Sequence, residues 1–434
     1  MPLCFHWRMD DEALVSLRRD LHRKPEPAWR EFYTTAKVVE TLESLEADLD
    51  VFVGPDAIAT EHRLALPDRD EIDSWYDQAT EYDVDLDVLE SLEGGYTGAV
   101  AVLEQGEGPT VGLRVDIDAL PQPEADGDDH VPAAEGFRSE HEGAMHACGH
   151  DAHATIGIGV IDAIANSDFQ GTLKAFFQPA EEVIGGGKSM AKSDHLADVD
   201  YLLAVHIGLD HPTGEVVAGV DGFLAVAHLE ATFYGEPSHA GGRPERGRNA
   251  NQALAAAVQN LYAIPRHSDG QTRVNAGVIE GGSAANIIAE EARLVAEVRG
   301  ETTELMEYMR EKSERVLEAA AEMHECELEI ETGSEAPSAT SDQALVSVVA
   351  DVASGVDGVE QILERDQLGG SEDATFLMRE VQQNGGLACY VGVGTDHPGG
   401  HHTSTFDVDE ASLRHGIDVL AGAIEQVSLE QPSQ

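Results

Sequence analysis

Basic side chains are scarce in this chain: 27 lysines and arginines stand against 82 aspartates and glutamates, for a formal net charge of −55. A surface of that sign repels nucleic acid and anionic membranes, so neither is an expected partner. The acids are scattered rather than gathered in blocks, which favours a halophilic protein kept soluble in concentrated salt. The charge therefore indicates the surroundings of the protein and not its chemistry.

Other features missing from the sequence exclude further classes of protein. The four cysteines lie far apart and predict no disulfide framework. No apolar run approaches the length of a membrane span, and the first residues do not read as a secretion signal, so we expect a soluble, cytoplasmic protein. Neither a Gly-Xaa-Ser-Xaa-Gly elbow nor a phosphate-binding loop occurs, which argues against serine hydrolases and nucleotide-binding enzymes.

What the sequence does contain is a long alternation of strand-like and helix-like segments. Residues 11–50 predict two helices, and the polar stretch 56–95 predicts an inserted helical excursion. From residue 97 to 206, apolar runs alternate with helical patterns, which is typical of a mostly parallel sheet covered by helices on both faces. The fold class expected for this part is therefore α/β.

A different pattern occupies residues 222–336. The predicted order there is β-α-β-β-α-β, the split βαβ arrangement of a small ferredoxin-like α+β domain. The α/β pattern returns after residue 336. We therefore expect a discontinuous catalytic domain formed by residues 1–221 and 337–434, with the small domain inserted between its two parts.

Side chains able to bind metals gather where the predicted strands end. Ligands in α/β folds collect beyond the carboxyl ends of the strands. Asp116 and Asp118 end one strand, Glu181 and Glu182 follow another, and His206 closes a third. Glu181 and Glu182 can share one site only if they lie in a loop, where one binds metal and the other acts as general base. Asp118 can orient a ligand histidine, although a turn aspartate is an equally ordinary interpretation.

The segment 145–153, Met-His-Ala-Cys-Gly-His-Asp-Ala-His, is the densest cluster of such residues. Cys148 and His150 stand just before a predicted helix, whose N-terminus favours a thiolate ligand. A buried cysteine beside a capping histidine is the alternative. His146 and His153 are more often hydrogen-bonded neighbours than ligands in such a position.

Distant histidines are expected to complete the site, with His402 in a glycine-rich stretch near the end of the chain. Five ligands exceed what one catalytic zinc with an open position accepts, so the set predicts two metal ions bridged by water: Cys148, His150, Glu182, His206 and His402. In the small domain, His239 could polarise a carbonyl, while Asn286 and Arg299 could contact substrate.

Five segments together resemble the amidohydrolase branch of the co-catalytic zinc-peptidase superfamily, which includes hippurate, auxin-amino-acid and p-aminobenzoyl-glutamate hydrolases: 112–121, 145–153, 177–182, 238–244 and 275–286. The similarity covers nearly the whole chain. The excursion at 56–95 and the ending at 400–407 most resemble the A-type subunits of p-aminobenzoyl-glutamate hydrolases.

This resemblance implies two divalent ions per chain, Mn²⁺ or Zn²⁺, and a small domain that serves dimerisation and closure as a lid. It implies that the five residues above bind metal, that Glu181 is the catalytic base and that His239 stabilises the transition state. Asn286 and Arg299 match substrate-contact positions. Other branches carry a histidine where this chain has Asp116, and Cys148 takes its place.

The function expected is metal-dependent hydrolysis of the amide bond in a small-molecule N-acyl or N-aroyl amino acid, with a p-aminobenzoyl-glutamate-like substrate favoured. The expected assembly is a homodimer or a hetero-oligomer with a related chain. A non-catalytic or partner-dependent subunit is the alternative, against which the complete residue set argues. A cysteine hydrolase using Cys148 and His150 has poor geometry and leaves Glu181 and Glu182 unexplained.

Overall fold

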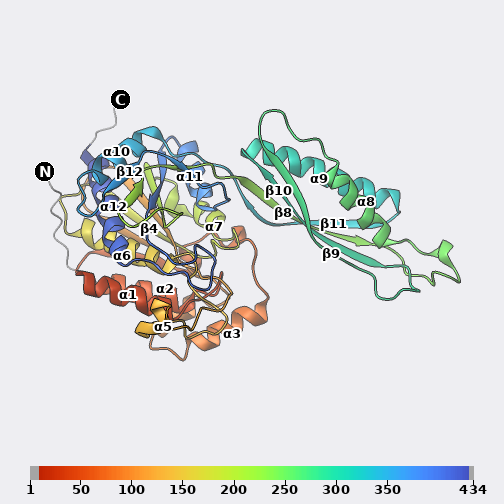
Figure 1. Ribbon diagram of the computed structural model, residues 1–434, viewed down its shortest axis with the longest axis horizontal. Coiled ribbons are helices and arrows are strands. Elements are labelled where there is room, and N and C mark those ends of the chain that lie inside the picture. The colour runs from red at the N-terminus through yellow and green to blue at the C-terminus, as the bar shows by residue number, and fades with distance from the viewer. Residues whose placement is uncertain (1–8, 430–434) are drawn as a thin grey trace. The chain divides into compact units, whose positions relative to one another are not determined.

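The computed structural model describes residues 9–429. The chain divides into two compact units (Figure 1). Unit 1 is formed by Met1–Asp221, Ala339–Leu368 and Asp373–Gln434, and unit 2 by Gly222–Ser338 and Gly369–Glu372. Among the helices of residues 9–429, none combines the length and apolar composition that crossing a bilayer requires.

Unit 1 is built on an eight-stranded sheet in the order β1-β2-β4-β3-β5-β14-β6-β12. The central strands β4, β3, β5 and β14 run parallel, whereas β1, β2 and β6 add antiparallel pairs toward the edges. This arrangement confirms the predicted α/β class with a mostly parallel core. The strands are β1 Leu49–Val53, β2 Ala99–Glu104, β3 Thr110–Asp116, β4 Thr172–Gln178, β5 Tyr201–Ile207, β6 Glu215–Val217, β12 Gln361–Leu363 and β14 Leu387–Val393.

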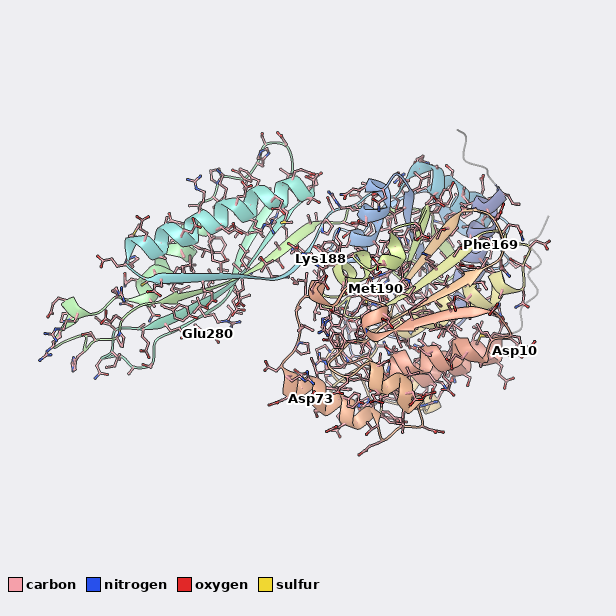
Figure 2. All side chains as sticks on the ribbon, turned by 180° about the vertical axis from the view of Figure 1, so that it is seen from behind. Asp10, Asp73, Phe169, Lys188, Met190 and Glu280 are labelled. Atoms are coloured by element: carbon pink, nitrogen blue, oxygen red, sulfur yellow. The ribbon has the colours of Figure 1, made fainter. Side chains whose placement is uncertain are left out.

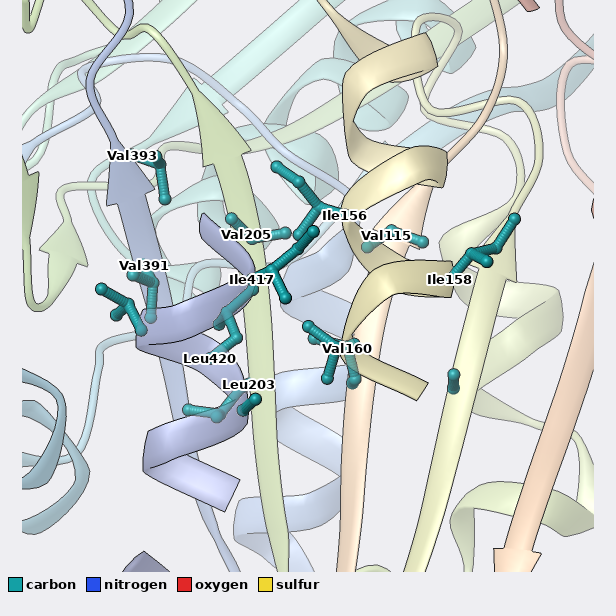
Figure 3. Close-up of a cluster of buried hydrophobic side chains, with 14 of the residues drawn as sticks. Val115, Ile156, Ile158, Val160, Leu203, Val205, Val391, Val393, Ile417 and Leu420 are labelled. Carbon is teal, nitrogen blue, oxygen red and sulfur yellow. The ribbon is translucent and has the colours of Figure 1, made fainter. Parts of the chain in front are cut away.

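Helices cover both faces of this sheet because its strands are apolar on both sides. On one face, Val115 and Val205 pack with Ile156 of α6 (His150–Ala165) and Ile417 of α12 (Ala411–Leu429), as Figure 3 shows. The same core includes apolar residues of α1 (Asp11–Arg23), α2 (Phe32–Ser44) and α10 (Gln343–Ala353). The opposite face contacts α7 (Gly187–Ala191) and α11 (Ala374–Gln383). Because helices cover both faces, the carboxyl ends of the strands remain as the place where ligands can bind.

The excursion at 56–95 contains α3 (Arg69–Ala79) and α4 (Leu86–Ser91). Asp73 on α3 is labelled in Figure 2. Smaller elements complete unit 1: α5 Val131–Glu135, the paired short strands β7 Val220–Asp221 and β13 Asp366–Gln367, and the 3-10 turns η1 Gly54–Asp56, η2 Thr60–His62 and η3 Asp194–Leu196. The sequence pattern did not predict β1, β6, β12 or α11. The strands are three to five residues long, and a hydrophobic period is not detectable over so few positions.

Unit 2 has the predicted order of elements. Its four strands form an antiparallel sheet in the order β11-β8-β10-β9, and α8 and α9 pack their apolar residues on one face. Alternate residues of β10 are buried, as a sheet covered on one side requires. The ferredoxin-like prediction is confirmed. The elements are β8 Ala225–Tyr234, η4 Pro244–Arg246, α8 Ala250–Tyr262, β9 Thr272–Gly281 (Glu280 in Figure 2), β10 Glu291–Gly300, α9 Thr303–Met323 and β11 Glu327–Ala336.

Candidate metal centre

The site candidates of unit 1 converge at the carboxyl edge of the parallel strands. Asp116 is the last residue of β3, the Glu181–Glu182 turn follows β4, and His206 is the penultimate residue of β5. The loop that contains His402 follows β14, the next parallel strand. Parallel pairing places these four strand ends on one edge, so residues almost 300 positions apart in the sequence meet there.

Cys148 and His150 are fixed by the start of α6. Gly149 is the N-cap and has a left-handed backbone, with φ +84°. A Cβ at Gly149 would lie 2.6 Å from Ile207 Cγ2, so only glycine allows α6 to begin this close to β5. The Cys148 Sγ atom is buried and lies 3.5 Å from His206 Nε2. The turn thereby places a thiol and two imidazoles together beside a helix N-terminus, which favours the thiolate.

The Glu181–Glu182 pair lies in a turn, the condition for both side chains to share one site. Asp118 holds that turn: its Oδ1 accepts a hydrogen bond from the Glu181 N–H and its Oδ2 from the Glu182 N–H, both at 3.0 Å. Asp118 Oδ1 also lies 3.3 Å from His150 Nδ1. One buried carboxylate thus contacts both the helix start and the glutamate turn.

Backbone strain concentrates in the same segments. Ala180, just before the glutamates, has φ +56°, and His402 has φ +59°. A left-handed conformation in a non-glycine residue costs about 1–3 kcal/mol and persists only where the surroundings impose it. The His402 N–H donates to the Ala147 carbonyl at 2.8 Å, and its ring Nε2 lies 3.4 Å from Glu182 Oε2. One strained residue, His402, is therefore a predicted ligand, and the other, Ala180, directly precedes the predicted base Glu181.

The electrostatics of this cluster suit a bound cation. Burial raises the pKa of Glu182 to about 8, with Asp118 and Asp116 adding to the effect against the opposing influence of His150. Burial alone would lower the pKa of His150, but Asp116, Asp118 and Glu182 raise it to about 10. The Nε2 atom of His150 and the Oε1 atom of Glu182 are buried without a hydrogen-bond partner. Such polar atoms need a compensating ligand, and a divalent ion supplies one.

Two groups of candidate ligand atoms share one residue. Cys148, His150 and His206 form one, and Cys148, Glu182 and His402 form the other; within each, the ligand atoms lie within 4.8 Å of one another. His150, Glu181 and Glu182 form a further group of this kind, which places the Glu181 carboxylate beside both. Burial and the rings of His153 and His401 lower the pKa of His206 well below its usual value, so its imidazole is neutral, as metal binding requires. The donor set fits two metal ions.

His153 occupies a different place in the arrangement. Its Nδ1 bonds Asp116 Oδ1, and its Nε2 accepts the Ile207 N–H at 2.8 Å, so both ring nitrogens are engaged. Asp116 is in turn held by Arg114 at 2.7 Å. His153 is thus hydrogen-bonded through both ring nitrogens, and with Asp116 and His150 it also forms a group whose ligand atoms lie within 4.8 Å of one another. The buried His146 also lies near the site, and burial lowers its pKa to about 3.

The remaining candidates belong to unit 2. His239 Nδ1 accepts hydrogen bonds from the Gly241 and Gly242 N–H groups, each at 3.1 Å. This places the ring proton on Nε2, so His239 presents an N–H donor. The Asn286 carbonyl accepts from the Ala240 N–H at 3.0 Å and thereby anchors the same loop.

Arg299, the predicted contact for a substrate carboxylate, is already paired with a carboxylate of the protein. Its Nε and Nη2 atoms donate to the two carboxylate oxygens of Glu297, at 2.6 and 3.0 Å. Glu297 also contacts His228 Nε2 at 3.2 Å. Glu297 therefore occupies the Nε side of this guanidinium, and a substrate carboxylate would have to bind through the Nη1 side or displace Glu297.

Sequence reasoning assigned no part to several residues that hold the site. Arg114 lies on a buried strand, and a charge there signals a buried partner. Arg18 and His22 on α1, and Glu31 before α2, are fully buried charged or titratable side chains that contact the ligand-bearing segments. A helical pattern marks their elements, but only the folded structure reveals which neighbours they meet.

The fold and this cluster define a two-domain metallohydrolase, and comparison with known families agrees. The model of peptidase family M20/M25/M40 matches residues 112–426. The chain belongs to this family, which confirms the resemblance in its motifs, and it is a metal-dependent amidohydrolase.

Particular relatives are similar along almost the whole chain. Indole-3-acetyl-aspartic acid hydrolase of Enterobacter agglomerans is 41% identical over 412 residues, which cover 94% of each chain. The A-type subunit of p-aminobenzoyl-glutamate hydrolase from Escherichia coli is 38% identical, covering 97% of this chain and 94% of that one. Among solved structures, an aminobenzoyl-glutamate utilization protein from Klebsiella pneumoniae superposes with a TM-score of 0.81 at 34% identity, covering 98% of this chain and 96% of that one.

Proposed function

We propose that this enzyme hydrolyses the amide bond between an aroyl or arylacetyl group and an acidic amino acid, aspartate or glutamate. The observation that carries the proposal is the pair of ligand groups sharing Cys148, with Glu181 beside them. The relatives named for indole-3-acetyl-aspartate and p-aminobenzoyl-glutamate supply the substrate class. Both names combine an aromatic acyl group with a dicarboxylic amino acid.

The ligands of the two proposed ions are Cys148, His150, Glu182, His206 and His402. Divalent ions held there, Mn²⁺ or Zn²⁺, would polarise the substrate carbonyl and acidify water. Glu181 takes a proton from the attacking water, whose oxygen bonds the carbonyl carbon. The C–N bond then breaks, and Glu181 returns the proton to the leaving nitrogen. The products are a carboxylic acid and a free amino acid.

Other side chains position these groups. Asp118 holds the backbone of both glutamates, which keeps the Glu181 carboxylate directed at the reacting centre. In unit 2, His239 offers an Nε2–H donor for the developing oxyanion, because its Nδ1 is occupied by two backbone N–H groups. Asn286 and Arg299 are proposed substrate contacts, with Glu297 as the competitor for the arginine.

Further proposals concern the assembly and surroundings of the enzyme. The small domain of residues 222–336 is proposed to serve dimerisation and to act as a lid over a catalytic domain of residues 1–221 and 337–434. A cytoplasmic location is proposed as well, and the net charge of −55 supports adaptation to concentrated salt. One relative is named as one of several subunits, which supports a second candidate, a chain that requires a related partner for activity.

A substrate panel tests these proposals. The chain is purified alone in molar salt, stripped with a chelator and assayed on indole-3-acetyl-aspartate, p-aminobenzoyl-glutamate and benzoyl-glycine, with and without Mn²⁺ or Zn²⁺. We expect metal-restored hydrolysis, faster on the two dicarboxylic substrates. A preference for benzoyl-glycine contradicts the substrate class. Metal binding without hydrolysis of any member favours the partner-dependent chain.

A further inference from the structure

Helix α1 places a fully buried guanidinium between two of the ligand-bearing segments. Arg18 Nε lies 2.8 Å from Asp151 Oδ2, and its Nη2 lies 2.6 Å from Asp407 Oδ1. Asp151 directly follows His150, and Asp407 lies five residues after His402. A single side chain therefore joins the segment that contains one proposed ligand to the segment that contains another.

His22, one helical turn further along α1, reinforces the same junction. Its Nδ1 lies 2.8 Å from the same Asp151 oxygen, and its Nε2 lies 2.9 Å from Glu124 Oε1. Glu124 also accepts the Ser139 N–H at 2.6 Å. The start of α6 is thus held from α1 by two buried side chains rather than by packing alone.

Glu31 makes the equivalent contact to the glutamate turn. Its Oε1 accepts the Ala180 N–H at 2.8 Å, while its Oε2 accepts the Thr97 hydroxyl at 2.6 Å. Ala180 is the residue with the strained left-handed backbone before Glu181. A turn of that conformation reverts unless its surroundings hold it, and a buried carboxylate on its N–H does so.

We propose that Arg18, His22 and Glu31 form an N-terminal brace that positions three ligand-bearing segments, 148–151, 180–182 and 402–407, for metal binding. The inference rests on the ligand set proposed above. These are positioning residues, because they act through Asp151, Asp407 and the Ala180 backbone. Stability alone is a weak reason for them, since a buried ion pair is often no more stabilising than apolar residues of equal volume. Their value lies in fixing one geometry.

The test compares Arg18→Met with Arg19→Met. Arg19 is the neighbour of Arg18 on α1 and pairs with Glu410 at 2.6 Å. In the described part of the chain, Arg19 forms no ion pair or hydrogen bond with Asp151 or Asp407. Each variant is stripped and titrated with Co²⁺ against a competing chelator. Two readouts besides activity are recorded: the dissociation constants and the thiolate-to-Co²⁺ absorption band of Cys148. Thermal unfolding of the metal-free forms reports any general loss of stability.

We expect Arg18→Met to weaken Co²⁺ binding by about 10–100-fold and to alter the thiolate band, as loss of an outer contact to a metal site does. Arg19→Met should stay within about twofold of the wild type, because Arg19 pairs with Glu410 and Glu135 and not with Asp151 or Asp407, although Glu410 also lies 3.8 Å from Arg18 Nη1. Wild-type affinity and an unchanged band in Arg18→Met overturn the brace. Failure of the wild type to bind Co²⁺ instead contradicts the ligand set itself.

A milder variant keeps the test decisive if Arg18→Met does not fold. Asp407→Asn keeps the size of the side chain and removes only the ion pair on the His402 side. We expect weaker binding at the site formed with Glu182 and His402, and little change at the one formed with His150 and His206. Equal weakening at both, or none at either, contradicts the brace.

Discussion

Replacing Asp118 with asparagine separates the positioning of Glu181 from its chemistry. The Asp118 carboxylate accepts two backbone N–H groups, from Glu181 and Glu182, each at 3.0 Å. Asparagine has one acceptor oxygen, so it preserves one bond and turns an NH₂ group toward the other N–H. A hydrogen bond to a charged group contributes about 1.5–3 kcal/mol. If that energy is lost in the transition state, kcat/KM falls by about 10–100-fold.

The assay measures kcat/KM for Asp118→Asn with each metal at saturation, beside Asp162→Asn as the matched control. Asp162 is also a buried carboxylate that accepts a backbone N–H, from Met9 at 2.9 Å. It lies twelve residues along α6 from His150, which is about 18 Å of helix. Activity of Asp118→Asn within twofold of the control refutes the argument that Asp118 positions the glutamates.

Three further predictions concern metal binding, salt and pH. Cys148→Ala should lose metal and activity together, whereas Cys389→Ala, whose buried thiol bonds the Ala218 carbonyl, should keep both; equal metal content in the two variants contradicts the ligand assignment. With a net charge of −55, the enzyme should unfold at a markedly lower temperature in about 0.1 M than in molar KCl, as calorimetry can measure. Burial raises the pKa of Asp418 to about 6, although the nearby Arg414 lowers this pKa in part. Because the folded protein holds this proton more tightly than the unfolded chain, the carboxyl destabilises the fold increasingly as the pH rises from about 4 through 6. Asp418→Asn should therefore stabilise the protein by about 1 kcal/mol at pH 7.5, after allowance for solvent screening, and by little at pH 4; an equal gain at both pH values contradicts the linkage.

The sequence predicts the fold well where elements are long and periodic. The α/β alternation and the split βαβ unit follow from apolar periods over segments such as Thr303–Met323 and Glu291–Gly300. β6 and β12 are only three residues long, and their strand state depends on pairing with each other across more than 140 residues. Local pattern has no information about such pairing.

The proposed site shows the same division. Residue types and strand ends indicate Cys148, Glu182 and His206, because few chemistries use thiol, carboxylate and imidazole together. Apart from Asp118, the residues that position these ligands could not be predicted from the sequence. Arg18 contacts Asp407, which is 389 residues away, and no spacing rule connects the two. In Arg299, the sequence shows an arginine but not the Glu297 carboxylate that already binds it.

Metal content and hydrolysis measured in Glu181→Gln beside the wild type test the proposed two-metal mechanism most directly. Glu181 is proposed as the base and not as one of the five ligands. We expect two metal ions per chain in both proteins, rapid hydrolysis of indole-3-acetyl-aspartate or p-aminobenzoyl-glutamate by the wild type, and loss of about 100-fold or more in kcat for the variant. Near-normal turnover in Glu181→Gln, or a wild type that is active after complete removal of metal, would contradict this mechanism.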